Sequence, residues 1–302
     1  MIHLNNISKT FKADILGQAF VALNNISFSI PEGSMVGFLG ANGAGKTTSL
    51  KIIMDFIRPT SGEVVFSSAL GKNKQEIFKN IGYLPERPYF YQNLSGEEFL
   101  HFMGDLSELS KNEIRTQISY WAPRFRIEHA LRRELKTYSK GMLQRIGFLA
   151  AILHQPKLII LDEPLSGLDP IGRKELKDVI VEVHKAGKTV FFSTHIVPDI
   201  EEICDRVVFL KDSKVAFDGS VTSLMDTNTD QAYVFKIKLN NKVEFKTPIT
   251  KKIELPDNLS TFTVNHEFKD KFLHEVIEKG GNLVGIEPLR VNLEEVFYKT
   301  KD

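Results

Sequence analysis

A glycine-rich octapeptide near the amino terminus constrains the fold more than any other feature of the sequence. It reads Gly-Ala-Asn-Gly-Ala-Gly-Lys-Thr and occupies residues 40–47. Its three glycines let the backbone curl so that successive N–H groups point inward, where their partial positive charges match phosphate oxygens. The lysine adds a full positive charge for the β and γ phosphates, and the threonine offers a hydroxyl to Mg²⁺. We therefore expect a loop that binds ATP.

The segments on either side of this loop support the prediction. Residues 35–39 are apolar and predict a buried strand. Apolar residues then recur from Leu50 to Ile57 at the spacing of one helix face, and Pro59 ends the pattern. The positive end of such a helix points at the same phosphates. The residues that we expect to hold ATP are Gly40, Asn42, Gly43, Ala44, Gly45, Lys46, Thr47 and Thr48.

A second apolar run delivers two acidic residues to the end of a strand. Residues 158–161 read Leu-Ile-Ile-Leu and are followed by Asp162 and Glu163. Ligands of open α/β sheets bind at this carboxyl edge of the strands. We expect Asp162 and Thr47 to contact Mg²⁺, and Glu163 to act as general base for a water in line with the γ-phosphorus. Taken alone, the pattern also describes a strand that ends in solvent, and the phosphate loop is what favours the functional interpretation.

The distribution of patterns along the chain predicts two domains. The chain has 302 residues, which exceeds the usual length of one domain. Residues 1–222 alternate apolar strands with helical patterns, as is typical of an α/β fold with a largely parallel sheet. Residues 88–155 lack strand patterns and contain a capping box that begins at Ser95, so we expect an inserted helical subdomain there.

Residues 223–302 predict a small α+β carboxyl-terminal domain. Alternating residues over 234–239, followed by an Asn-Asn pair, predict a hairpin. Residues 268–277 have the apolar spacing of a helix, and the Gly-Gly pair that follows shortly afterwards would end it. The sequence gives no mechanism for this domain, although a role in stabilising or regulating an ATPase dimer is compatible with it.

Composition and charge exclude several classes of protein. Hydrophobic residues make up 42% and charged residues 25%, which argues against a disordered chain or a membrane-embedded body. Lys and Arg total 39 against 38 for Asp and Glu, so no strong basic field favours nucleic acid. A single cysteine, Cys204, and a start without a signal-peptide pattern favour the cytoplasm. No apolar run reaches the length of a membrane-spanning helix.

Three further motifs reveal a family resemblance. Residues 138–145 read Tyr-Ser-Lys-Gly-Met-Leu-Gln-Arg, residues 166–169 read Ser-Gly-Leu-Asp, and residues 193–195 read Ser-Thr-His. With the phosphate loop and the acidic strand, this ordered set resembles an ABC ATPase over residues 1 to about 222. The resemblance implies a P-loop NTPase fold with a RecA-like core, an antiparallel β subdomain and an inserted helical subdomain.

The resemblance also implies roles for individual residues. Two copies would pair head to tail, so that Ser139 and Gly141 of one chain contact the γ-phosphate bound by the other. Asp169 would bridge the two subunits near these composite sites. His195 would contact the γ-phosphate and help to hold Glu163 and the attacking water. The residues themselves leave simpler alternatives open, because Ser139 also suits a helix N-cap and Asp169 an Asp-Pro turn.

Some positions match the family pattern less closely. Phe11 fits the aromatic residue that stacks on adenine, but a core role is also possible, and Phe20 is nearby. Glu86 stands where a Mg²⁺-contacting Gln is usual, and we expect its carboxylate to take over that role with different tuning. The signature departs from the usual Leu, Gly and Gln at three positions, which are Tyr138, Lys140 and Met142.

Two short segments point to one branch of the family. Residues 82–86, Gly-Tyr-Leu-Pro-Glu, and residues 293–297, Leu-Glu-Glu-Val-Phe, resemble the ATP subunits of type 2 ABC exporters. This implies a homodimer, or a heterodimer with a related chain, on the cytoplasmic face of the cell membrane. A separate integral-membrane permease would dock a cytoplasmic helix beside the helical subdomain. Residues 89–91, Tyr-Phe-Tyr, either line that groove or belong to the core.

Two other functions compete with this interpretation. A non-transport ABC ATPase that acts on ribosomes or nucleic acid is disfavoured, because such proteins carry two ATPase domains or a long coiled coil between loop and signature. The segment from Lys46 to Ser139 is too short for such a coiled coil. A nucleotide-binding regulator without turnover is disfavoured because Glu163 and His195 are both present.

Overall fold

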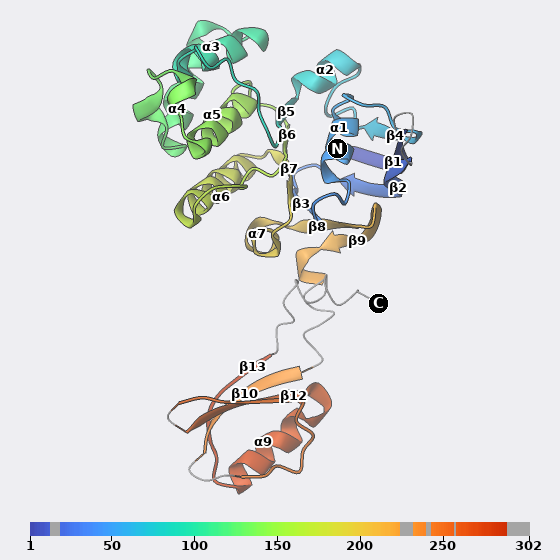
Figure 1. The fold of residues 1–302 in the computed structure, drawn as a ribbon, viewed down its shortest axis with the longest axis vertical. Coiled ribbons are helices and arrows are strands. Elements are labelled where there is room, and N and C mark those ends of the chain that lie inside the picture. The colour runs from blue at the N-terminus through green and yellow to red at the C-terminus, as the bar shows by residue number, and fades with distance from the viewer. Residues whose placement is uncertain (13–18, 224–231, 240–242, 257, 289–302) are drawn as a thin grey trace. The chain divides into compact units, whose positions relative to one another are not determined.

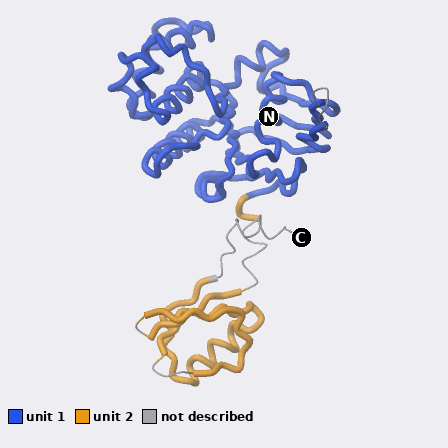
Figure 2. Tube along the Cα trace, in the orientation of Figure 1, with its two compact units in different colours: residues 1–220 blue, residues 221–302 orange. Residues whose placement is uncertain are grey.

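The computed structural model describes most of the chain (Figure 1). The described residues are 1–12, 19–223, 232–239, 243–256 and 258–288. Contacts divide the chain into two units, Met1–Ser220 and Val221–Asp302, which Figure 2 distinguishes by colour. Each unit contains its own cluster of buried hydrophobic residues.

A six-stranded sheet forms the centre of the first unit. Its strand order is β5-β6-β7-β3-β8-β9, and neighbouring strands are parallel except for β9, which runs antiparallel to β8. Strands β3, β6 and β7 are buried along their whole length, which explains why the sequence shows them as nearly continuous apolar runs. The strands are β3 (Met35–Leu39), β5 (Ile81–Leu84), β6 (Leu158–Leu161), β7 (Thr189–Thr194), β8 (Arg206–Lys211) and β9 (Lys214–Ser220).

A smaller antiparallel sheet shares a core with the central sheet. It has the order β2-β1-β4, formed by β1 (Ile2–Phe11), β2 (Phe20–Ile30) and β4 (Ser61–Phe66). Phe28 of β2 contacts Phe38 and Phe191 of the central sheet, with ring centroids 5.3 Å and 6.0 Å away. The predicted α/β architecture with a separate antiparallel subdomain is confirmed.

The helix after the phosphate loop is shorter than the sequence predicts. Helix α1 (Lys46–Ile53) ends before Ile57, because Asp55 adopts a left-handed backbone conformation with φ of 57°. Met54 and Ile57 still pack against the core from the turn that follows the helix. Apolar spacing alone therefore overestimated the helix, because it cannot distinguish a last helical turn from a packed loop.

The segment between β5 and β6 is helical, as predicted. The predicted capping box is present, since the Ser95 side chain accepts the Glu98 N–H and the Glu98 carboxylate accepts the Ser95 N–H. Short 3₁₀ helices span Glu128–Ala130 and Leu135–Thr137. The α-helices of this segment are α3 (Gly96–Leu106), α4 (Lys111–Arg124) and α5 (Lys140–Ile152).

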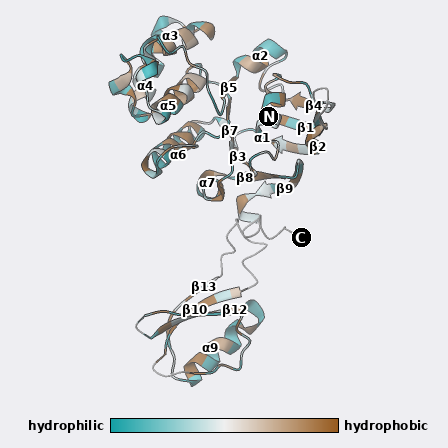
Figure 3. Ribbon diagram, in the orientation of Figure 1, coloured by the Kyte–Doolittle hydropathy of each residue, from teal (hydrophilic) through white to brown (hydrophobic). Residues whose placement is uncertain are grey.

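The remaining helices of the first unit lie before and after that segment. They are α2 (Lys74–Lys79), α6 (Pro170–Lys185) and α7 (Val197–Ile203). Hydrophobic and hydrophilic residues alternate around α6, which buries one face containing Leu176, Ile180 and Val183 (Figure 3). Helix α7 approaches β3 so closely that a Cβ on Gly37 would lie 2.1 Å from the Ile200 side chain. Glycine at that position is what allows α7 to pack on the sheet.

The second unit has a four-stranded antiparallel sheet packed on one helix. The strand order is β11-β12-β10-β13, and α9 (Lys269–Glu278) contributes the buried Phe272. The predicted helix is confirmed, and Gly280, with φ of 68°, follows its end. The strands are β10 (Ala232–Lys238), β11 (Lys251–Glu254), β12 (Leu259–Asn265) and β13 (Asn282–Pro288).

The predicted hairpin in this unit is wrong in its pairing. Strand β10 pairs with β12 and β13, whereas the next strand along the chain, β11, pairs with β12. The Asn-Asn pair at residues 240–241 lies outside the described residues. Strand β10 lies between β12 and β13, neither of which follows it directly in the chain, and it buries Phe235 and Ile237 in the core that includes α9. This tertiary packing outweighs the local turn signal.

A buried carboxylate connects α9 to the segment before β11. The Glu275 carboxylate accepts hydrogen bonds from the N–H groups of Lys246 and Thr247 and from the Thr247 hydroxyl. Burial raises the pKa of Glu275, but these hydrogen bonds and the Lys279 ammonium outweigh it and lower the pKa to about 2. The ionised form of Glu275 therefore stabilises this unit.

Replacing Glu275 with Gln should reduce the free energy of opening of the second unit by about 1–3 kcal/mol at pH 7. The folded pKa lies below the unfolded value of about 4.3, so the stabilisation is present above that pH and is lost as the pH falls toward 2. Hydrogen exchange of β10 and β12 peptides in the full chain, at pH 7 and pH 3, measures both effects. Glu278→Gln, on an exposed position of α9, is the matched control. Equal protection in both variants at pH 7 would contradict this account.

Candidate active site

A cavity of about 360 Å³ opens at the carboxyl ends of the central strands. It gathers the phosphate loop, Glu163, which lies two residues after β6, and His195, which directly follows β7, at one edge of the sheet, as the α/β arrangement predicts. Phe20 and Ser166 also line it, although neither was among the predicted site residues. The lining residues are Phe20, Ala22, Ala41, Asn42, Gly43, Gly45, Lys46, Thr47, Thr48, Glu86, Glu163, Ser166 and His195.

The phosphate loop has the backbone that its glycines suggested. Gly43 and Gly45 have φ values of 85° and 111°, a backbone region that residues with a side chain rarely adopt. A Cβ on Gly40 would lie 2.6 Å from the Leu210 carbonyl oxygen, so the loop also packs tightly on β8. Helix α1 begins at Lys46, within the last two residues of the loop, which places the positive end of the helix at the cavity.

The Lys46 ammonium is buried and lies close to three acceptor groups. The residue is 5% exposed, and its Nζ donates to the Gly40 and Ala41 carbonyls at 2.6 Å and 3.3 Å. The same Nζ lies 3.2 Å from Glu163 Oε1, which forms an ion pair but no hydrogen bond. A buried cation needs such partners, and phosphate oxygens are acceptors of the same kind.

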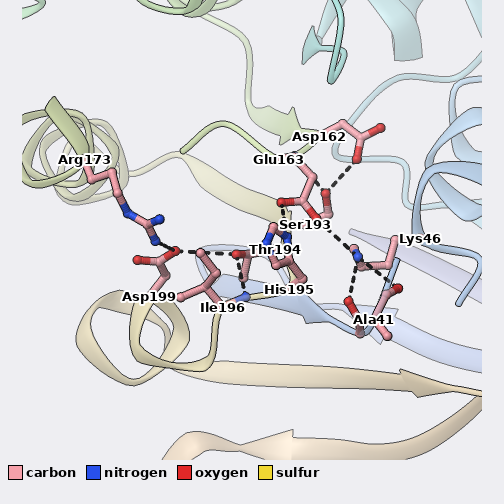
Figure 4. A network of polar contacts seen from close by, with 11 residues as sticks. Ala41, Lys46, Asp162, Glu163, Arg173, Ser193, Thr194, His195, Ile196 and Asp199 are labelled. Carbon is pink, nitrogen blue, oxygen red and sulfur yellow. Dashed lines mark hydrogen bonds and ion pairs between the residues drawn. The ribbon is translucent and has the colours of Figure 1, made fainter. Parts of the chain in front are cut away.

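Glu163 stands at the centre of the polar contacts. It is 9% exposed, and its Oε2 lies 3.0 Å from Nδ1 of His195, opposite the contact of Oε1 with Lys46 (Figure 4). Its backbone adopts φ of 50°, and its N–H donates to the Ser193 hydroxyl at 2.9 Å. A left-handed, non-glycine residue in a cavity is the kind of strain that marks functional sites. The carboxylate is thus fixed between an imidazole and an ammonium.

The neighbouring Asp162 is completely buried beneath the cavity. Its Oδ1 accepts a hydrogen bond of 2.7 Å from the Ser193 hydroxyl, whereas Oδ2 has no hydrogen-bond partner among the described residues. Burial raises the pKa of Asp162, the hydroxyls of Ser193 and Thr47 oppose this shift, and the charges of Glu86 and Glu163 add to it. A buried carboxylate oxygen without a donor fits a cation, which would favour the ionised form.

Ser193 is a site residue whose role the sequence did not reveal. It donates to Asp162 and accepts from the N–H of Glu163, so one hydroxyl orients both acidic residues. Its position follows from the strand register, because β6 and β7 are parallel neighbours in which Leu161 pairs with Phe192. The residue after Phe192 must then lie beside the residue after Leu161. That register became known only with the structure.

The signature residues lie apart from the cavity of their own chain. Ser139 caps α5, with its hydroxyl 3.3 Å from the Met142 N–H, and Asp169 caps α6, 3.1 Å from the Gly172 N–H. Neither of them, nor Gly141, is among the described residues that line the cavity. The N-cap alternative for Ser139 is therefore present in the structure, and it leaves the N-terminus of α5 oriented for an anion.

The two aromatic residues near the cavity occupy facing strand positions. Phe11 of β1 pairs with Phe20 of β2, and only Phe20 is among the described cavity-lining residues. The Lys9 ammonium lies 5.1 Å from the centroid of the Phe11 ring. Residues 13–18, which connect the two strands, lie outside the described residues.

Three residues that depart from the family pattern, Tyr138, Lys140 and Glu86, have defined surroundings in the structure. The Tyr138 hydroxyl is buried and donates to the Ala130 carbonyl at 2.7 Å, so its extra polar atom is satisfied within the helical segment. A Cβ on Gly167 would lie 2.3 Å from Nζ of Lys140, which places the Lys140 side chain against the segment before α6. Glu86 lines the cavity with a partly exposed carboxylate.

Comparisons with known proteins identify the family of this chain. A family model described as ABC transporter matches residues 23–166. An uncharacterized ABC transporter ATP-binding protein of a Nostoc species is 33% identical over 98% of this chain and 88% of its own length. YxlF of Bacillus subtilis, which has the same description, is 36% identical over 92% of this chain and 94% of its own.

One similar solved structure is a dimer with the products of ATP hydrolysis bound. The dimeric cassette MJ0796, in a post-hydrolysis state bound to ADP and Pi, superimposes with a TM-score of 0.65. It is 25% identical and covers 73% of this chain and 99% of its own. The predicted family, fold and ATPase activity are confirmed. This chain belongs to the ABC transporter ATP-binding protein family, and it is an ATPase.

Proposed function

We propose that the chain is the ATPase subunit of an ABC exporter and that it hydrolyses ATP by general-base catalysis through Glu163. The observation that carries the proposal is the fixed Glu163 carboxylate between His195 and Lys46, in a cavity formed by the phosphate loop. Such a carboxylate accepts a proton from a water as the water attacks the γ-phosphorus. His195 holds the carboxylate in place, and the loop N–H groups hold the phosphates.

Mg²⁺ is the cofactor that we assign to this cavity. The unpartnered Oδ2 of Asp162 and the hydroxyl of Thr47 support its binding, and Glu86 would contact it directly or through water. Mg²⁺ commonly takes one or two protein ligands and completes its shell with phosphates and waters. This agrees with the finding that the described residues contain no cluster of three or more His, Cys, Asp or Glu suited to a metal. When bound, Mg²⁺ neutralises negative charge on the phosphates.

We assign the second half of each site to another copy of the chain or to a related one. Ser139 and Gly141 lie at the N-terminus of the 13-residue helix α5, and this end of a helix favours an anion. In a head-to-tail dimer they would contact the γ-phosphate held by the partner, and Asp169 would lie near the boundary. ATP binding would then close the dimer, and hydrolysis would release it.

An aromatic surface on the helical segment is our candidate docking site for the permease. Tyr89 is 86% exposed, Tyr91 is 53% exposed, and the Tyr91 ring packs edge-on against Phe102 with centroids 5.4 Å apart. Phe90 differs from its neighbours, since it is buried against Phe99 and belongs to the core. Exposed aromatic clusters of this kind are typical of protein interaction surfaces.

The direction of transport and the location follow from the branch of the family. The exporter assignment depends on residues 82–86 and on residues 293–297, and the latter lie outside the described residues. No helix in the described part of the chain has the length and hydrophobicity to cross a membrane. The branch of the family is the ground on which we place the subunit on the cytoplasmic face of the cell membrane, bound to a separate integral-membrane permease.

Glu163→Gln should lower the rate of phosphate release about 10²- to 10⁴-fold, because the amide cannot accept the proton from water. ATP binding should be retained, because the phosphate loop is unchanged, and the ATP-bound dimer should accumulate. Single-turnover phosphate release, ATP titration and size-exclusion chromatography measure these three outcomes. Glu182→Gln, which removes a carboxylate that pairs with Arg124 on the surface, is the control. Unchanged turnover in Glu163→Gln would exclude Glu163 as the base.

Tyr91→Asp should abolish co-purification of a permease from detergent-solubilised membranes, because a charge in the aromatic cluster opposes its burial in an interface. ATP turnover of the isolated chain should stay unchanged, since Tyr91 lies outside the cavity. Mass spectrometry of the captured membrane proteins identifies the permease, and Tyr120→Asp on α4 provides an exposed aromatic control. Capture of ribosomes by the unaltered chain would favour the non-transport alternative.

A further inference from the structure

The loop that carries His195 is fixed from both sides by polar contacts outside the cavity. Strand β7 ends at Thr194, one residue before His195, and α7 begins two residues after it. The Thr194 hydroxyl accepts the N–H of Ile196 at 3.1 Å and donates to Asp199 Oδ2 at 3.5 Å. The residues immediately before and after His195 are thus connected through one hydroxyl (Figure 4).

Asp199 anchors this hydroxyl to a buried ionic network. The residue lies in α7 and is 2% exposed, and its Oδ2 accepts a hydrogen bond of 2.7 Å from Nη2 of Arg173. Lys177 lies 3.8 Å from Oδ1 and also pairs with Glu202 on the surface. A buried carboxylate requires such compensation, and two cations of one helix supply it.

The two cations lie on α6, the helix that begins just after Asp169. Arg173 and Lys177 lie one turn apart on α6, whose N-cap is Asp169. Asp169 is the residue that the proposed dimer places near the second subunit. A continuous set of contacts therefore runs from the first turns of α6 through Asp199 to the His195 loop, and from His195 to Glu163.

We propose that Asp199 is a positioning residue that holds His195 against Glu163 and makes this contact depend on the placement of α6. The inference depends on the proposed roles of Glu163 and His195. Without Arg173 the buried Asp199 carboxylate loses its strongest partner, and if the carboxylate moves away, Thr194 loses its second hydrogen bond and the backbone around His195 is free to shift. Displacement of a positioned catalytic group by about 1 Å is enough to slow a reaction about 10²-fold.

A purely structural role for the network makes a different prediction. In that case Asp199 serves only to join α6 to α7, and its loss lowers stability without acting through His195. The Lys177–Glu202 pair joins the same two helices from the surface, whereas the Thr194 hydroxyl donates to Asp199. The Lys177–Glu202 pair therefore provides a matched control for helix packing.

Asp199→Asn should reduce kcat for ATP turnover about 10- to 100-fold, the usual effect of losing a group that orients a reacting one. KM should stay unchanged, because the phosphate loop is intact. Thr194→Val should cause a similar loss while leaving the Arg173–Asp199 pair in place, and Thr194→Ser should retain activity. If Asp199→Asn does not fold, the kcat of Thr194→Val tests the proposal instead. Glu202→Gln should keep the turnover of the unaltered chain.

A double-mutant cycle with His195→Ala decides between the two roles. If Asp199 acts through His195, Asp199→Asn or Thr194→Val should change kcat by less than about 2-fold in the His195→Ala background. Losses that multiply would overturn the positioning role and leave the proposed function intact. Unchanged turnover in His195→Ala and Glu163→Gln would instead overturn the proposed function, and the positioning role with it.

Discussion

The parallel pairing of β6 with β7 is the constraint on which the site depends. Because Leu161 and Phe192 lie opposite each other, the residues that follow them emerge side by side at one edge of the sheet. Asp162 and Glu163 thereby share the hydroxyl of Ser193, and His195 reaches the Glu163 carboxylate. Strand β3 pairs with β7 on the other side and delivers the phosphate loop to the same edge. Hydrogen-bonded register thus assembles groups from distant parts of the chain.

Several features of this edge oppose stability. Glu163 has a left-handed backbone, Lys46 is a buried cation, and one buried oxygen of Asp162 has no hydrogen-bond donor in the described part of the chain. Each of these features destabilises the fold on its own, and the surrounding apolar sheet compensates for them. Two of them fit a nucleotide site, because a cation would pair with the Asp162 oxygen and phosphate oxygens would accept further hydrogen bonds from Lys46. The Asp199 network, by contrast, satisfies its charges internally.

Comparison of sequence and structure shows which local signals can be trusted. The capping box at Ser95 and the glycine stop near Gly280 were predicted correctly, because both depend on residues close in sequence. The end of α1 and the pairing of β10 were predicted wrongly, since packing against other segments decided them. The cavity is lined by Phe20 and not by its strand partner Phe11, a difference that depends on the pairing of β1 with β2 and is not visible in the sequence.

The sequence by itself determined the chemical groups of this protein: the phosphate loop, the acidic pair after β6 and the histidine after β7. These are local patterns whose residue types follow from the chemistry of phosphate, Mg²⁺ and water. The tertiary structure alone decided how these groups contact one another, including the double hydrogen bond of Ser193 and the link from Arg173 through Asp199 to the His195 loop. Such contacts depend on strand register and helix packing, which arise from long-range burial and leave no fixed spacing in the chain.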